Sequence, residues 1–214
     1  MLLTCFALKE EAAPFRKIAA AKTGVAILIV GIGRQNAEKS VRNFLATNTP
    51  ELALTCGFAG GLNPELQLGD VVFEALFDPP SSLLPLQAKL QAAGAKPVSF
   101  HCADRIATTV AEKKALRERT GADAVEMESA AIQAVCRERG VPCVTLRVIS
   151  DQANEDLPLD FNALAKADRN LDFGKLAWSL AKSPAKIGPL LALQRKTSLA
   201  AKRLAAVLAQ VIFP

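Results

Sequence analysis

Short runs of consecutive apolar residues alternate along the chain with longer stretches that mix apolar and charged positions. A run of about four to eight apolar residues bounded by glycine or polar residues is typical of a buried strand. Such strands are predicted at residues 2–8, 25–30, 52–62, 70–77, 97–103, 124–127 and 141–150. Helices are predicted at residues 10–21, 34–47, 83–93, 111–119 and 129–139, and over much of the C-terminal part. This alternation favours a sheet covered by helices on both faces, the α/β class.

Composition supports one globular unit and excludes several functions. Half of the 214 residues are hydrophobic and 22% are charged, which is enough for a sizeable core. Five scattered cysteines without C-x-x-C spacing indicate reduced thiols in a cytoplasmic protein. A single histidine, His101, argues against a zinc site and a Ser-His-Asp hydrolase, so no metal is expected. The N-terminus lacks a basic leader before Lys9, and the longest apolar run is too short to span a bilayer.

The net charge of +5 is concentrated at the C-terminus. Residues 174–214 contain seven basic side chains and no acidic one, leaving 19 of the 26 basic and all 21 acidic residues in 1–173. We expect 1–173 to form the main domain and 174–214 a basic helical extension packed on it. The amphipathic part, 188–212, suits either a docked helix with a solvated basic face or peripheral attachment to an anionic membrane. Binding of nucleic acid by the whole protein is not indicated.

Two carboxylates, Glu126 and Glu128, interrupt an apolar stretch in ADAVEMESAAIQAVC. Burying a charge without a partner is costly, so these side chains are expected to meet one. In a strand, residues two apart face the same side, which would point both into one space. Ser129 is expected to cap the following helix. A carboxylate at a strand end can accept two short hydrogen bonds from the vicinal hydroxyls of a polyol.

Unusual residues follow several predicted strands: GIGR, CGFAGG, VEMES and VISD. In α/β sheets, ligands gather at the carboxyl ends of the strands. The lone G-x-G at residues 31–33 lacks the third glycine of a dinucleotide-binding fingerprint. Each feature also has a plain structural interpretation, because glycines form turns, Asp151 could cap a helix, and Glu11 could be a solvated first-turn acid.

Four motifs in order resemble the superfamily of purine nucleoside phosphorylases and methylthioadenosine/S-adenosylhomocysteine nucleosidases. They are FALKEEAAPF at 6–15, GFAGGLNPELQLGDVV at 57–72, AVEMESAAIQAVC at 124–136 and VTLRVISDQA at 144–153. The resemblance implies a three-layer α/β/α fold with a mixed central sheet. The segment from Ala103 to Ser129 and the basic tail are more similar to the hopanoid-associated phosphorylase group, which is proposed to remove adenine from adenosylhopane.

The resemblance assigns the chemistry to two residues. Asp151 would hold or donate the proton at the purine N7, and Glu11 would position and activate the attacking water. Cleavage of an N-glycosidic bond passes through an oxocarbenium-like transition state, in which positive charge forms on the sugar and negative charge on the leaving base. A buried acid at the base and a carboxylate on the opposite side of the sugar suit these charges.

The same resemblance assigns binding roles around the sugar and base. Glu128 would accept hydrogen bonds from the ribose 2′- and 3′-hydroxyls, Met127 would pack against the sugar, and Gly60 would let the backbone approach it. Glu126 would support the site. Counting back from the VEMES motif places Arg105 where the family usually has an aromatic residue that stacks on adenine. The base-binding assignments implied in this region and at the last strand end are Arg105, Ile106 and Ser150.

One departure bears on the reaction. Phosphorylases of the family have an arginine and a serine near the third-strand glycines, but Phe58 stands in place of the serine. Arg34 is the candidate phosphate ligand, with Arg16 as another source of charge. Because Glu11 is present, we expect hydrolysis, with no cofactor. The alternatives are phosphorolysis with inorganic phosphate as co-substrate and a non-catalytic nucleoside- or lipid-binding protein. The family implies a homo-oligomer, and the 5′-substituent is left open.

Overall fold

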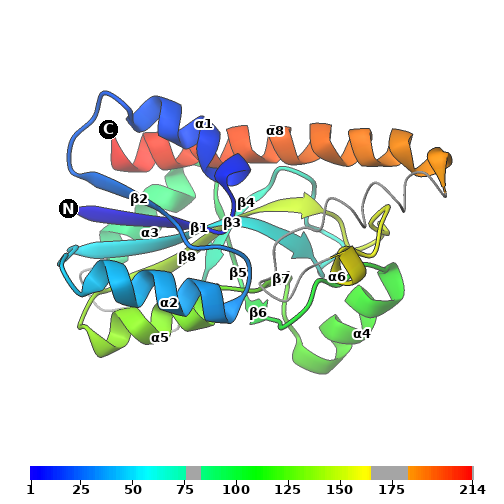
Figure 1. Cartoon of the computed structure of the whole chain (residues 1–214), viewed down its shortest axis with the longest axis horizontal. Helices are drawn as coiled ribbons and strands as arrows, with labels where there is room; N and C mark the ends of the chain where they lie inside the picture. The colour runs from blue at the N-terminus through cyan, green and yellow to red at the C-terminus, as the bar shows by residue number, and fades with distance from the viewer. Residues whose placement is uncertain (76–82, 165–182, 214) are drawn as a thin grey trace.

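The fold is a sheet between two layers of helices (Figure 1). A computed structural model describes residues 1–75, 83–164 and 183–213. Helices α1 (Lys9–Ala19), α3 (Leu84–Ala92) and α8 (Ile187–Ile212) contribute to the core on one face of the sheet. Helices α2 (Arg34–Leu45) and α5 (Ser129–Glu138) cover the opposite face. The predicted α/β/α architecture is confirmed.

The sheet is mixed, as the resemblance implied. Its main path has the order β2-β1-β3-β8-β4-β5, and β7 joins β3 to β6 beside this path. Strands β1, β2, β3 and β8 are mutually parallel where they pair, whereas β4 is antiparallel to β8 and β7 is antiparallel to β3. The strands are β1 (Leu2–Phe6), β2 (Val25–Ile29), β3 (Leu52–Gly61), β4 (Val71–Glu74), β5 (Lys96–Val98), β6 (Phe100–Cys102), β7 (Ala124–Glu126) and β8 (Cys143–Asp151).

The predicted strand at 97–103 is wrong in one respect, because the segment forms two strands with different partners. Strand β5 pairs with β4, and β6 pairs with β7. Ser99 lies between them, and its backbone N–H and hydroxyl both donate to the carboxylate of Asp123. The chain therefore crosses here from the main sheet to the β6–β7 pair, which carries the acidic motif.

Helix α4 (Val110–Thr120) lies beside this pair and begins and ends through local interactions. The Thr109 hydroxyl accepts from the Glu112 N–H, and the Glu112 carboxylate accepts in return from the Thr109 N–H. Gly121 ends the helix with φ of 69°, a left-handed conformation that favours glycine. The short helix α6 (Phe161–Leu164) follows β8 further along the chain.

The C-terminal helix α8 is part of the fold over its second half. Ala200, Leu204 and Leu208 are fully buried in the same core as Phe15 of α1. Its first half is mostly exposed, including Ile187 and Leu191, and runs beyond the body in Figure 1. No helix in the described ranges is long and apolar enough to cross a membrane. The domain boundary at 173/174 falls outside the described residues, and lipid attachment and oligomerisation stay predictions.

Candidate active site

A buried arginine on β8, Arg147, is the centre of the polar cluster in the core. Its side chain is 1% exposed, and its Nη2 lies 2.5 Å from Glu126 Oε2 and 3.3 Å from Glu128 Oε2. The same nitrogen donates to Thr55 Oγ1 on β3 at 3.2 Å, and Nη1 donates to the Cys56 carbonyl at 3.4 Å. The acidic pair therefore meets a cation in the core, as its burial required.

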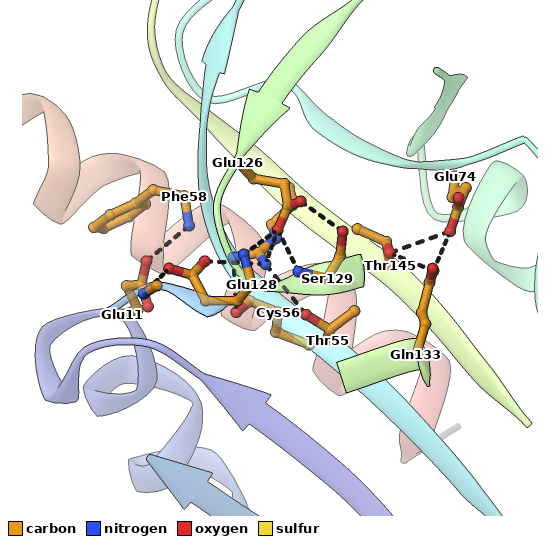
Figure 2. A network of polar contacts seen from close by, with 12 residues as sticks. Glu11, Thr55, Cys56, Phe58, Glu74, Glu126, Glu128, Ser129, Gln133 and Thr145 are labelled. Atoms are coloured by element: carbon orange, nitrogen blue, oxygen red, sulfur yellow. Dashed lines mark hydrogen bonds and ion pairs between the residues drawn. The ribbon is translucent and has the colours of Figure 1, made fainter. Parts of the chain in front are cut away.

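The two acids reach Arg147 by a route that strand alternation did not predict. Strand β7 ends at Glu126, and Glu128 has φ of −124° and ψ of −30°, outside the strand region. The Glu126 carboxylate accepts from the backbone N–H groups of Glu128 and Ser129 and from the Ser129 hydroxyl (Figure 2). The prediction that Ser129 caps helix α5 is wrong, because the cap is supplied by Glu126. This supports the non-catalytic role expected for Glu126.

Glu11 joins the cluster from the first turn of α1 and is 3% exposed. Its carboxylate accepts from the Leu8 N–H at 2.8 Å. It also accepts from the Phe58 N–H at 2.9 Å (Figure 2). Glu128 is held similarly, because its Oε1 accepts from the Gly33 N–H at 2.9 Å. The interpretation of Glu11 as a solvated surface acid is therefore wrong. Backbone N–H groups from two loops, at Leu8 and Gly33, and from Phe58 of strand β3 position the two carboxylates.

One guanidinium faces three carboxylates, and the pKa values reflect this imbalance. Burial raises the pKa of Glu11 to about 7, although Arg147 and the N–H of Phe58 act in the opposite direction. Burial also raises the pKa of Glu128, against the effect of Arg147. Burial alone would raise the pKa of Glu126, but Arg147 and the donors of Ser129 hold it below its ordinary value. The cluster therefore retains an exchangeable proton near neutral pH.

Gly57 on β3 leaves the space that this cluster needs. A Cβ atom at this position would lie 2.7 Å from Arg147 Nη1 and 2.8 Å from Glu11 Oε1. Its φ of 146° is also one that other residues rarely adopt. Any side chain here would separate the arginine from the carboxylate of Glu11.

Asp151, at the end of β8, is held by a second buried cation. Its Oδ2 lies 2.6 Å from Nζ of Lys113, a fully buried residue of α4. Its Oδ1 accepts from the Ser150 hydroxyl at 2.7 Å. Gly60 is paired with Asp151 across β3 and β8, and a Cβ there would lie 3.3 Å from the Asp151 carboxylate. Asp151 is thus fixed in the fold, and the hydroxyl of Ser150 is directed at this carboxylate.

The backbone of Ile106 is engaged by the side chain of Asn162. The Ile106 N–H donates to Asn162 Oδ1, and Asn162 Nδ2 donates to the Ile106 carbonyl, both at 2.9 Å. Arg105 forms an ion pair with Glu112 at 2.6 Å. Its side chain is 65% exposed, so stacking on the base is not supported by this geometry and stays a prediction.

Arg34 stands at the start of α2 with its side chain more than half exposed. Its Nε lies 3.9 Å from Asp104 Oδ1. The structure therefore directs this guanidinium at Asp104, whereas Glu11 and Glu128 face Arg147. Met127, between the two acids of the motif, is largely buried, and its contact with a sugar stays a prediction. In the described part of the chain, no group of three or more His, Cys, Asp or Glu side chains is placed to hold a metal.

Three site residues escaped the sequence analysis: Arg147, Lys113 and Asn162. A signal existed for Arg147, since a charged residue within the apolar run VTLRVIS needs a buried partner. Lys113 had no such signal, because it stands in a strongly charged helical segment where an exposed lysine is ordinary. Asn162 also lacked one, because only the packing of α6 brings it to Ile106.

The α/β/α fold with its mixed sheet, and the buried cluster of three acids around Arg147, are typical of an enzyme. Comparison with known proteins gives the family. The phosphorylase superfamily model matches residues 85–182. The methylthioadenosine/S-adenosylhomocysteine nucleosidase of Shewanella halifaxensis is 31% identical over 62% of this chain and 70% of its own length. The aminodeoxyfutalosine nucleosidase of Campylobacter jejuni is 28% identical over 61% and 69%.

Solved structures agree on the fold. The methylthioadenosine/S-adenosylhomocysteine nucleosidase of Helicobacter pylori superposes with a TM-score of 0.71 at 20% identity, over 99% of this chain and 97% of that one. The futalosine hydrolase of the same organism gives a TM-score of 0.71 at 17% identity, over 99% and 96%. The chain belongs to the phosphorylase superfamily and is an enzyme of its nucleosidase type.

Proposed function

We propose that the protein hydrolyses the N-glycosidic bond of an adenine nucleoside and releases the free base. The observation that carries this proposal is the Glu11 carboxylate, fixed by two backbone N–H groups and raised in pKa to about 7. A general base works best when its pKa lies near the working pH. Glu11 would take a proton from water as the water oxygen bonds to C1′ and the bond from C1′ to the base nitrogen breaks.

The remaining residues have complementary roles in this proposal. Glu128 would bind the ribose hydroxyls, and Asp151 would hold the proton that N7 receives as the base departs. Within the described residues, Nε of the buried Arg147 has no hydrogen-bond partner. A buried donor without a partner is costly, so this N–H is suited to bind a water or substrate oxygen. Its position in the Glu11–Glu128 cluster supports binding of the attacking water.

Contacts around Glu11 favour water over phosphate as the nucleophile. The N–H groups of Leu8 and Phe58 are the kind of donors that hold an anion, but both are bound to the carboxylate of Glu11. The phenyl ring of Phe58 cannot donate to phosphate, and Arg34 is directed at Asp104. A phosphate would also meet the negative charge of Glu11 when that residue is ionised. These contacts disfavour phosphorolysis, which is the second candidate.

The Asn162 amide supports adenine as the base. An amide offers one acceptor and one donor, the pattern that N1 and the 6-amino group of adenine also present. Ile106 accommodates that pattern with its N–H and carbonyl at 2.9 Å each. We propose that these two backbone groups bind the adenine edge once Asn162 has withdrawn. The 5′-substituent, including the hopanoid side chain suggested by the finer resemblance, stays a prediction.

The test is release of free base from adenosine, methylthioadenosine and a hydrophobic 5′-adenosyl compound, each with and without phosphate. We expect adenine and a free sugar at the same rate in both conditions. Glu11→Gln should lower kcat by about 10²–10³-fold, whereas the control Glu10→Gln alters an exposed neighbour and should not. Strict dependence on phosphate, with sugar 1-phosphate as product, would establish phosphorolysis. No release from any nucleoside would favour a binding protein.

A further inference from the structure

We propose that Lys113 is a positioning residue that acts on the leaving group through Asp151. This inference rests on the proposed function of Asp151 and assigns a role to a residue outside the four motifs that carry the superfamily resemblance. Lys113 lies on α4, a helix with several charged residues on its surface. It is fully buried, whereas the next residue, Lys114, is 76% exposed.

All three N–H donors of the Lys113 ammonium have acceptors. Nζ lies 2.6 Å from Asp151 Oδ2, 2.7 Å from the Gln152 carbonyl and 2.8 Å from the Glu155 carbonyl. The acceptors surround the ammonium, which therefore holds in place both the Asp151 carboxylate and the turn that follows β8. Because the Ser150 hydroxyl holds Oδ1, the Asp151 carboxylate is restrained at both oxygens.

Burial of a lysine at this position is an expensive way to dock a helix. An apolar side chain of similar length would fill the same space without removing an ammonium from water. A buried ion pair is weak evidence for a stabilising role, because the cost of removing both charges from water can exceed their attraction. Lys113 compensates the charge of Asp151 and places a cation behind the group that faces the departing base. As Asp151 gives its proton to N7 of the departing base, negative charge forms on its own carboxylate, and the Lys113 ammonium 2.6 Å away stabilises that charge.

The experiment compares Lys113→Met and the matched control Lys114→Met on two kinds of substrate. One is the natural type, an adenine nucleoside, whose base needs a proton to depart. The other is 4-nitrophenyl β-D-ribofuranoside, whose phenolate departs without one. We expect Lys113→Met to lower kcat about 10²-fold on the adenine nucleoside and less than fivefold on the nitrophenyl riboside. KM should change little, and Lys114→Met should match the unmodified protein on both.

A double-mutant cycle with Asp151→Asn tests whether the two residues act as one unit. If Lys113 acts through Asp151, the double variant should be no slower on the adenine nucleoside than Asp151→Asn alone. Lys113→Arg keeps the positive charge and should retain more kcat than Lys113→Gln. If Lys113→Met does not fold, comparison of Lys113→Arg with Lys113→Gln still tests whether the positive charge is needed for kcat.

Two results would overturn the inference. One is a folded Lys113→Met, or Lys113→Gln, protein with unchanged kcat on the adenine nucleoside. The other is an equal loss of kcat on both substrates, which would indicate a merely structural role. Failure of the proposed function has a different signature, because the unmodified protein would then release no base from any nucleoside.

Discussion

Two buried cations organise the candidate site in different ways. Arg147 faces three carboxylates, of which Glu11 and Glu128 have raised pKa values, and its Nε has no partner in the described structure. Lys113 faces one carboxylate and two carbonyls, and its three donors are all used. The first arrangement has an excess of acid groups over cations, and the second is balanced.

The comparison teaches what each arrangement can do. An excess of buried acid keeps a proton in exchange near neutral pH, which suits a base that activates water. The Lys113–Asp151 pair, in which every ammonium donor has an acceptor, fixes the position of the carboxylate. That suits a residue that must be held in one orientation toward the leaving base. In the proposed reaction, the Arg147 cluster with Glu11 would act on the sugar side of the glycosidic bond, and the Lys113–Asp151 pair would act on the side of the base.

The largest expected effect comes from removal of the cation in the crowded cluster. Arg147→Met would leave Glu11, Glu126 and Glu128 without charge compensation in the core. Breaking a buried ion pair from one side costs roughly 3–5 kcal/mol. We expect that loss in the free energy of unfolding, measured by urea denaturation at pH 7.5.

A surface arginine provides the control for this change. Arg42 pairs with Glu138 at 2.5 Å, but both side chains are about half exposed. Arg42→Met should leave the denaturation midpoint almost unchanged, because exposed pairs contribute little. Similar losses for the two variants would show that Arg147 does not compensate a buried charge cluster.

The pH dependence sharpens the comparison. Glu11 accepts a proton only when ionised, so kcat/KM should rise about tenfold per pH unit below about 7 and level off above it. Stability should move in the opposite direction. A pKa raised from 4.5 to about 7 means that the folded state binds this proton more tightly than the unfolded chain. The stabilisation is complete below pH 4.5 and is lost as pH rises through 7, a change of roughly 3 kcal/mol.

Measurements of kcat/KM and of the free energy of unfolding between pH 5 and 8 test both predictions on the same protein: the first should rise with pH and the second should fall. A buffer-independent limb with a midpoint near 7 is the expected kinetic result. A kcat/KM that is nearly constant from pH 5.5 to 8 would show that Glu11 behaves as an ordinary exposed acid. Stability that rises from pH 5 to 8 would contradict the predicted linkage.

The smallest expected effect concerns Asn162, whose amide binds the backbone of Ile106. If the Asn162 amide occupies the groups that bind the base, Asn162→Ala should remove a competitor and lower KM for adenosine by about fivefold. Asn154→Ala, an exposed change in the segment between β8 and α6, is the control and should leave KM unchanged. A raised KM in Asn162→Ala would show that the amide assists binding and does not compete.

The sequence by itself determined the class of the fold. Apolar runs such as VAILIV and VPCVTLRVIS have to be buried on both faces, and that requirement alone predicts a covered sheet. The resemblance of four motifs then gave the family and placed Glu11, Glu128 and Asp151 in it. The burial of these three acids, each between 3% and 6% exposed, fits the demand that they meet partners.

Only the tertiary structure decided who those partners are. Arg147 is 19 residues from Glu128 in the chain and far from Glu11. They meet because β8 lies beside β3, and the first turn of α1, which carries Glu11, follows the end of β1 in the same sheet. Lys113 looks like any other lysine of a charged helix until α4 docks against the turn after β8. The periodicity of apolar residues predicts which side chains become buried. It does not predict which partner a buried charge meets, because that depends on the distances between segments that are far apart in the sequence.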